Sequence, residues 1–302
     1  MASEQMEQSK TVIKKMMASG FAPKFDGSAD PLKLRSVVQA AQERMATEPG
    51  VTFEPDTLGG IEAELSVPEN AREDALIVYI HGGGLICGNA FSSRGYASML
   101  AGETKIPVYS FSYRLAPENK FPAAVDDCFE AYKAIVEKNP GRPLFLIGES
   151  GGAYLSIVTA IKARNNGVKM PAGIIPYSPI LDFSGTINRV REGNKDFTVT
   201  AEGLPWLYDL YCGSETDRKN PCVSPYFDDM HGMPPMLLAW DESETLAPDS
   251  MWLRDQLAKN GIECHARSYP DCFHAFATTG RGTPESAEVL ADTVAFINAH
   301  IF

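Results

Sequence analysis

Ser150 lies in a short run of small residues, GESGG (148–152). An apolar run that predicts a strand (143–147) comes directly before it, and a run that predicts a helix (153–163) comes directly after it. In this position a serine hydroxyl can act as a nucleophile held on a tight turn between strand and helix. The flanking glycines are needed because side chains there would clash with the neighbouring strand and helix. The alternative interpretation is an ordinary tight loop.

Three glycines follow another predicted strand, in the motif HGGG (81–84). Glycines at a strand end free backbone N–H groups to approach a substrate oxygen, and acyl transfer needs such donors where the tetrahedral intermediate carries negative charge. We predict Gly82 and Gly83 as donors, with the N–H of Gly151 completing an oxyanion hole. A phosphate-binding loop is not indicated, because the glycines lack Rossmann or Walker spacing. His81 itself is interpreted as structural.

A serine nucleophile needs a general base, and the chain contains five histidines. The base is expected near the C-terminus, on the loop after the last strand, and His274 lies there. His265 falls inside a predicted strand, which favours ordinary packing. His231 is interpreted as a surface residue, and His300 lies two residues from the end of the sequence.

The histidine in turn needs a carboxylate that fixes its tautomer and stabilises its charged form. Such a group is expected after the predicted strand 235–240. Four acidic residues follow that strand, and a cluster of this kind is usually a solvated surface. Spacing alone does not choose among them: Asp241, Glu242, Glu244 and Asp249.

Alternating strands and helices are expected to position these residues. Short apolar runs predict buried strands, and longer amphipathic runs predict helices between them. The alternation predicts an α/β fold with a mainly parallel sheet that is covered on both faces, the first two strands being antiparallel. The predicted strands cover residues 51–57, 60–68, 75–80, 108–113, 143–147, 172–178, 235–240 and 263–269.

Two regions stand outside this alternation. Residues 1–46 are predicted to be helical, and residues 183–230 contain no evident strand. We interpret the second region as an insertion that folds over the sheet, joined by the N-terminal helices. Its aromatic residues Trp206, Tyr208 and Tyr211 are candidates for an apolar wall of a binding pocket, or else for the core of the insertion itself.

Composition limits the class of protein. A formal net charge of −12 disfavours binding to nucleic acid or an anionic membrane surface, both of which need a basic footprint. The six cysteines form no C-x-x-C pair, so no zinc or redox motif is present. Neither a signal peptide nor an apolar run long enough to span a membrane is evident. We therefore expect a soluble, cytoplasmic protein that does not bind nucleic acid.

Several motifs resemble the hormone-sensitive-lipase-like esterases, a branch of the α/β-hydrolase fold. They occur in the order HGGG (81–84), YRLAPE (113–118), FPAAVDD (121–127), GESGG (148–152) and SPYFDDMHGMPP (224–235). The resemblance implies an eight-stranded sheet, a helical cap and hydrolysis of short-chain acyl esters through an acyl-enzyme intermediate, without a cofactor or a metal. The implied division is a catalytic domain of residues 47–182 and 231–302, with a cap of residues 183–230 and 1–46.

Carried over from the family, the catalytic triad is Ser150, His274 and an acid. The family's usual D-P-L motif aligns with Glu244-Thr245-Leu246, so the resemblance implies Glu244 rather than Asp241. This chain departs from the family pattern at three other positions. The departures are Glu149 in place of Asp, Gly151 in place of Ala, and Ala275 in place of Gly.

Other functions remain open at this stage. The same triad serves lactonases and amidases. A second alternative is a non-catalytic, ligand-binding α/β-hydrolase, such as the plant hormone receptor that resembles this family. A non-catalytic relative is expected to lack a triad member, whereas each role here has a candidate. The sequence names no particular ester, and it leaves the oligomeric state open between a monomer and a homodimer.

Overall fold

One mixed sheet organises the chain in the computed structural model, which describes residues 1–20, 24–42 and 44–301. The spatial order is β1-β2-β4-β3-β5-β6-β7-β8, antiparallel at β1–β2 and β2–β4 and parallel elsewhere. The strands are β1 (Val51–Leu58), β2 (Ile61–Pro68), β3 (Leu76–Ile80), β4 (Val108–Phe111), β5 (Leu144–Glu149), β6 (Gly173–Tyr177), β7 (Met236–Asp241) and β8 (Cys264–Tyr269). The predicted α/β fold, with eight strands, is confirmed.

Strand composition follows from position in the sheet. The central strands β3, β4 and β6 are buried along their whole length, as expected where helices cover both faces. At the edge, β8 alternates between half-buried and exposed residues before it ends at a buried Tyr269. Burial on both faces explains why uninterrupted apolar runs marked the central strands in the sequence.

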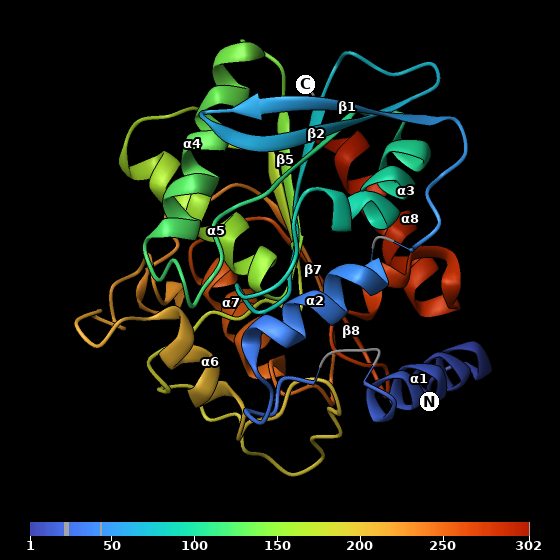
Figure 1. Ribbon diagram of the computed structural model, residues 1–302. Coiled ribbons are helices and arrows are strands. Elements are labelled where there is room, and N and C mark those ends of the chain that lie inside the picture. The colour runs from blue at the N-terminus through green and yellow to red at the C-terminus, as the bar shows by residue number, and fades with distance from the viewer. Residues whose placement is uncertain (21–23, 43, 302) are drawn as a thin grey trace.

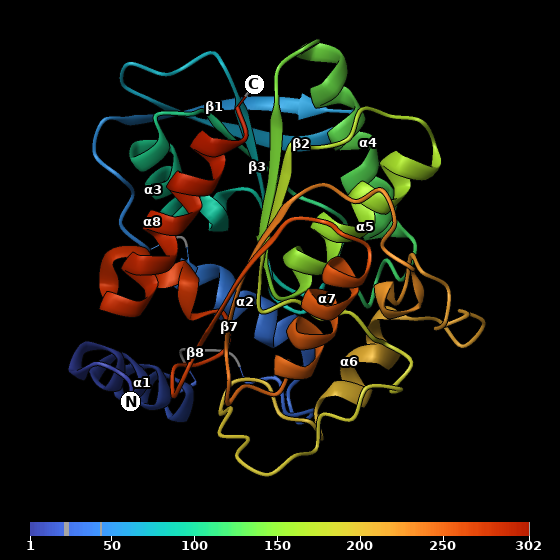
Figure 2. The same cartoon turned by 180° about the vertical axis from the view of Figure 1, so that it is seen from behind.

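Helices cover both faces of the sheet (Figures 1 and 2). One face carries α3 (Arg94–Thr104) and α8 (Pro284–Ala299), and the other carries α4 (Ala123–Lys138), α5 (Gly151–Asn165) and α7 (Ala247–Lys259). Short 3₁₀ turns are η1 (Phe91–Ser93), η2 (Pro225–Phe227) and η3 (Phe276–Gly282). A capping box between Thr283 and Ser286 starts α8.

The region between β6 and β7 is mostly loop, with the single helix α6 (Leu204–Tyr211) apart from η2 among the described residues. Phe25 pairs with it: its N–H donates to Thr198 O at 2.9 Å, and Thr200 N–H donates to Phe25 O at 3.4 Å. The predicted N-terminal helices are α1 (Glu4–Ala18) and α2 (Pro31–Gln42). Residues 21–23 and 43 of that predicted region lie outside the described residues. The proposed domain limits stay a prediction.

Candidate active site

Ser150 lies on a sharp turn between β5 and α5. Its backbone angles are φ 55° and ψ −118°, an unfavourable region for a residue with a side chain. The turn depends on glycines, as the sequence indicated. A Cβ on Gly148 would lie 2.5 Å from the carbonyl of Gly152, and a Cβ on Gly152 would lie 2.0 Å from Ile80 O. The surrounding backbone therefore holds Ser150 in an arrangement that fits a nucleophile elbow.

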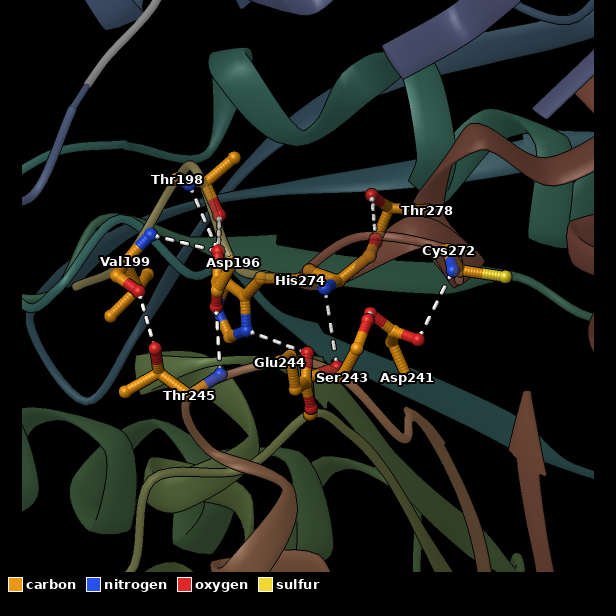
Figure 3. A network of polar contacts seen from close by, with 12 residues as sticks. Asp196, Thr198, Val199, Asp241, Ser243, Glu244, Thr245, Cys272, His274 and Thr278 are labelled. Carbon is orange, nitrogen blue, oxygen red and sulfur yellow. Dashed lines mark hydrogen bonds and ion pairs between the residues drawn. The ribbon is translucent and has the colours of Figure 1, made fainter. Parts of the chain in front are cut away.

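His274 and Glu244 lie in contact, although thirty positions separate them in sequence. Nδ1 of His274 is 3.1 Å from Oε2 of Glu244, and the two side chains are 8% and 0% exposed (Figure 3). In the described part of the chain, Nε2 of His274 has no hydrogen-bond partner. Ser150 and His274 border the same cavity. The imidazole is thus held at Nδ1 by a buried carboxylate, and among the described residues its Nε2 is unpartnered.

Burial and charge act on the pKa of His274 in opposite directions. Burial lowers the pKa of the imidazole, while the hydrogen bond and the negative charge of Glu244 raise it. The balance places the pKa of His274 above its ordinary value. For Glu244, burial raises the pKa, and His274 opposes the shift. Each group therefore stabilises the charged form of the other.

Asp241, the other candidate acid, has different partners. Its Oδ2 accepts a hydrogen bond from Ser243 Oγ at 2.7 Å, and its Oδ1 accepts one from Cys272 N–H at 3.1 Å. The carboxylate therefore ties the loop after β7 to the loop after β8, beside His274 (Figure 3). Of the two candidate acids Glu244 and Asp241, it is Glu244 that contacts the imidazole.

Glu149 accepts the hydrogen bond of one of the N–H groups that were predicted to form the oxyanion hole. Its Oε1 accepts a hydrogen bond from Gly82 N–H at 2.7 Å, and its Oε2 accepts one from Tyr79 Oη at 2.6 Å. Gly82 is therefore not available to a substrate, because its only N–H is already bonded. Gly83 and Gly151, the other two predicted donors, both border the cavity. Burial raises the pKa of Glu149 to about 7.

The side chain of His81 is buried beside the backbone of the HGGG loop. It is 2% exposed, and its ring stacks on Tyr113 with centroids 4.2 Å apart. Burial lowers the pKa of His81 to about 4, so the imidazole is neutral at neutral pH. A buried, neutral and stacked ring agrees with the structural interpretation of His81.

The cavity beside Ser150 has a volume of about 180 Å³ and mostly apolar walls. Its apolar lining includes Phe25, Val38, Ile180, Phe183, Leu204 and Leu207. Two of these, Leu204 and Leu207, come from α6 of the insertion.

The three aromatic residues proposed from α6, Trp206, Tyr208 and Tyr211, are not among the residues that line this cavity. Tyr211 is fully buried and its hydroxyl lies 3.0 Å from the hydroxyl of Tyr154. Tyr208 accepts a hydrogen bond from Arg189 at 2.7 Å, and Trp206 packs against Gly27. Tyr211 thus contacts α5, Tyr208 contacts Arg189 of the insertion and Trp206 contacts the N-terminal region, whereas Leu204 and Leu207 of the same helix reach the cavity. Amphipathic pattern alone does not say which apolar face meets a cavity.

Three further cavity residues, Phe25, Val38 and Gln42, come from the N-terminal region and were missed as site residues. The available signal was a helical apolar stripe in α2, where Leu34 and Val38 are buried one turn apart. That pattern predicts a buried face without naming the surface that covers it. A long sequence separation between α2 and Ser150 hides the contact.

The described residues show neither a metal site nor a helix that could span a membrane. They contain no group of three or more His, Cys, Asp or Glu side chains placed to hold a metal ion. None of their helices combines the length and apolar character of a membrane span. All six cysteines are free thiols.

Comparison with known proteins places this geometry in a family. Residues 77–278 match the family model described as alpha/beta hydrolase fold. An esterase of Acinetobacter venetianus is 30% identical over 268 residues, 88% of each chain, and an acetyl-hydrolase of Streptomyces hygroscopicus is 30% identical over 278 residues, 90% of each. A hormone-sensitive lipase from a metagenome library superposes with a TM-score of 0.87 at 30% identity, covering 97% of this chain and 99% of that one. The chain belongs to the α/β-hydrolase fold family, in the branch of hormone-sensitive-lipase-like bacterial esterases.

Proposed function

We propose that this ester hydrolase is a serine carboxylesterase that cleaves short-chain acyl esters through a triad of Ser150, His274 and Glu244. One observation carries the proposal. Nδ1 of His274 lies against the buried Glu244, while Nε2 has no partner in the described part of the chain and the ring borders the cavity of Ser150. Catalytic hydrogen bonds are often incomplete in a free enzyme and form with substrate.

The reaction follows from these positions. Nε2 of His274 takes the proton of Ser150 as Oγ attacks the ester carbonyl, and Glu244 stabilises the imidazolium. The tetrahedral intermediate then collapses, and His274 gives the proton to the departing alcohol. A water molecule, activated by the same nitrogen, hydrolyses the acyl-serine and releases the acid.

The developing oxyanion needs donors at the end of β3 and the start of α5. We assign this role to the backbone N–H groups of Gly83 and Gly151, which both border the cavity. A Cβ on Gly83 would lie 2.6 Å from Cys87 O, and its φ of 97° also favours glycine. The loop can therefore approach a substrate only with glycine at that position.

Cavity size supports a short acyl group. Its volume of about 180 Å³ is below the roughly 300–1,000 Å³ of pockets for drug-sized ligands. The walls are apolar, which suits an alkyl chain, and one relative at 30% identity is named an acetyl-hydrolase. Short esters such as acetates and butyrates fit both observations.

The test measures hydrolysis of a series of 4-nitrophenyl esters from acetyl to palmitoyl, with matched lactones and anilides. We expect the highest kcat/KM between acetyl and hexanoyl. Ser150→Ala should lose on the order of 10⁶ in kcat, because serine and histidine act as a unit. Turnover of Ser150→Ala close to that of the parent, or preference for lactones, anilides or palmitate, would contradict the proposal.

Paired variants test the acid in the same assay. Glu244→Gln keeps the side-chain volume but favours the wrong imidazole tautomer, and the loss in the serine-protease case is about 10⁴ in kcat. Asp241→Asn should cost much less, because Asp241 bonds Ser243 and Cys272 rather than the imidazole. The reverse order of losses would assign the acid to Asp241.

A further inference from the structure

The triad acid lies in a loop that the cap insertion holds. We define the acid loop as residues 242–246, between β7 and α7, and the clamp segment as residues 191–199 of the insertion. Arg191 donates to the carbonyl oxygens of Glu242 and Glu244, the second at 2.8 Å. Lys195 N–H donates to Ser243 O at 2.9 Å. The clamp segment thus bonds the backbone on both sides of the triad acid.

Asp196 is the centre of the clamp segment (Figure 3). Its Oδ1 accepts hydrogen bonds from Thr198 N–H at 2.9 Å, Thr198 Oγ1 at 2.7 Å and Val199 N–H at 3.0 Å. Its Oδ2 accepts one from Thr245 N–H at 3.0 Å. One oxygen therefore shapes the clamp segment, while the other fixes the residue directly after Glu244.

Thr245 returns the contact. Its Oγ1 donates to Val199 O at 2.7 Å and lies 3.0 Å from Nδ2 of Asn194. Thr245 is fully buried, so losing these bonds would leave buried polar groups without partners. Val199 also borders the cavity, which places one wall of the substrate site on the same segment that holds the acid.

No regular secondary structure fixes the acid loop between the end of β7 at Asp241 and the start of α7 at Ala247. The position of the Glu244 backbone therefore depends on the contacts made by residues 242–246. A displacement of about 1 Å in a catalytic group can cost on the order of a hundredfold in rate. The bonds of the clamp segment are accordingly relevant to catalysis as well as to folding.

We propose that Asp196 is a positioning residue for the triad acid, so that the cap insertion forms part of the catalytic apparatus. This inference rests on the proposed function, because it assigns Asp196 a role through Glu244.

The negative charge of Asp196 gives the proposal a second measurable consequence, in the pH dependence of kcat/KM. Three carboxylates face His274: Glu244 from the acid loop, Asp196 from the clamp segment and Glu149 from the end of β5. Each of the three carboxylates raises the pKa of the imidazole when it is ionised. His274 must be neutral to accept a proton, so kcat/KM rises with pH through the pKa of His274. Removing the charge of Asp196 should move this acid limb to lower pH.

The test is Asp196→Asn, assayed on a butyrate ester across pH 4.5–9. The amide nitrogen cannot accept a hydrogen bond from Thr245 N–H while the amide oxygen still serves Thr198 and Val199. We expect kcat to fall by about tenfold or more, with a smaller change in KM, and the acid limb to shift to lower pH. If Asp196→Asn fails to fold, Thr245→Val removes the bond to Val199 O and should lower kcat by about threefold to tenfold.

Asp182→Asn is the matched control. Its carboxylate also accepts backbone bonds inside the insertion, from Ser184 N–H at 2.8 Å and Ile187 N–H at 2.7 Å. Among the described residues, its side chain has no hydrogen bond to the acid loop. We expect a lowered Tm in both variants, but a loss of kcat and a shifted acid limb in Asp196→Asn alone.

The outcomes distinguish failure of the positioning role of Asp196 from failure of the proposed function. Parental kcat and an unchanged acid limb in Asp196→Asn would overturn the positioning role, as would equal losses in both Asp→Asn variants with parental pH profiles. Thr245→Val keeps the backbone N–H that Asp196 accepts and removes only the bond to Val199 O, so parental kcat in that variant would overturn the claim that the cap insertion forms part of the catalytic apparatus. Ser150→Ala is measured alongside, and if that variant still turns over, the proposed function itself fails.

Discussion

At the residue scale, Glu149 precedes Ser150 in sequence and bonds the backbone of Gly82 in the HGGG loop. The pKa of its carboxyl group is raised above the ordinary value. Burial raises its pKa to about 7, and Gly82 and Tyr79 oppose that shift with hydrogen bonds. Between its ordinary pKa of 4.5 and about 7, the native state therefore holds a proton that the unfolded chain has lost. Native stability must fall as pH rises through this window, because the unfolded state binds fewer protons.

Glu149→Gln removes this titration. From pH 4.5 to 7, we expect the free energy of unfolding of the parent to fall by about 3 kcal/mol relative to the variant. Urea unfolding of both proteins at several pH values measures the difference, in which the titration of the other buried carboxylates cancels. Parallel curves for the two proteins would show that Glu149 titrates at its ordinary pKa.

At the scale of elements, the two N-terminal helices are expected to differ in function. α1 packs on α8 and the loop before His274: Ser3 Oγ donates to Glu285 at 2.8 Å, and Lys10 donates to Asp271 O at 2.8 Å. α2 instead brings Val38 and Gln42 to the cavity. Deleting residues 1–19 should lower Tm, because Met6 of α1 is fully buried, but should keep kcat/KM within about threefold, because none of these residues lines the cavity. Deleting residues 1–45 should lower kcat/KM much further.

The two truncations are compared on the same ester series, with melting followed by circular dichroism. The point variant Phe25→Ala serves as a control that removes one cavity wall while both helices stay. It should lower kcat/KM with little change in the melting of the sheet. Unchanged kcat/KM in the longer truncation would exclude the N-terminal helices from the substrate site.

The elements also show what the sequence could predict. Each predicted strand falls on an observed one, because central strands buried on both faces give apolar runs that few other structures give. That Ser150 and His274 border one cavity was predictable, because the ends of parallel strands meet at one edge of a sheet. The cap was less predictable: Tyr208 and Tyr211 were candidates for the cavity wall or the insertion core, and Tyr208 bonds Arg189 of the insertion while Tyr211 packs against Tyr154 of α5. Loop contacts such as those of Asp196 depend on tertiary packing and leave no periodic signal.

At the scale of the whole molecule, a buried ion pair joins the cap insertion to the sheet domain. Arg189 donates to Oδ2 of Asp249 from Nε at 2.8 Å and to Oδ1 from Nη2 at 2.6 Å. Their side chains are 4% and 0% exposed. Arg189 also bonds Tyr208 of α6, while Asp249, in the first turn of α7, accepts Leu181 N–H at 2.7 Å. The pair therefore connects α6, α7 and the strand end after β6.

Breaking one side of such a pair leaves an uncompensated buried charge, which typically costs 3–5 kcal/mol. Arg189→Met should therefore lower the free energy of unfolding by about that amount. The double variant Arg189→Met/Asp249→Asn should recover part of the loss, because both charges are gone and the amide oxygen still accepts Leu181 N–H. Urea unfolding of the parent, both single variants and the double variant gives the coupling energy. Additive losses would mean that the two charges do not interact, so the cap would be held by its other contacts, including those of the clamp segment.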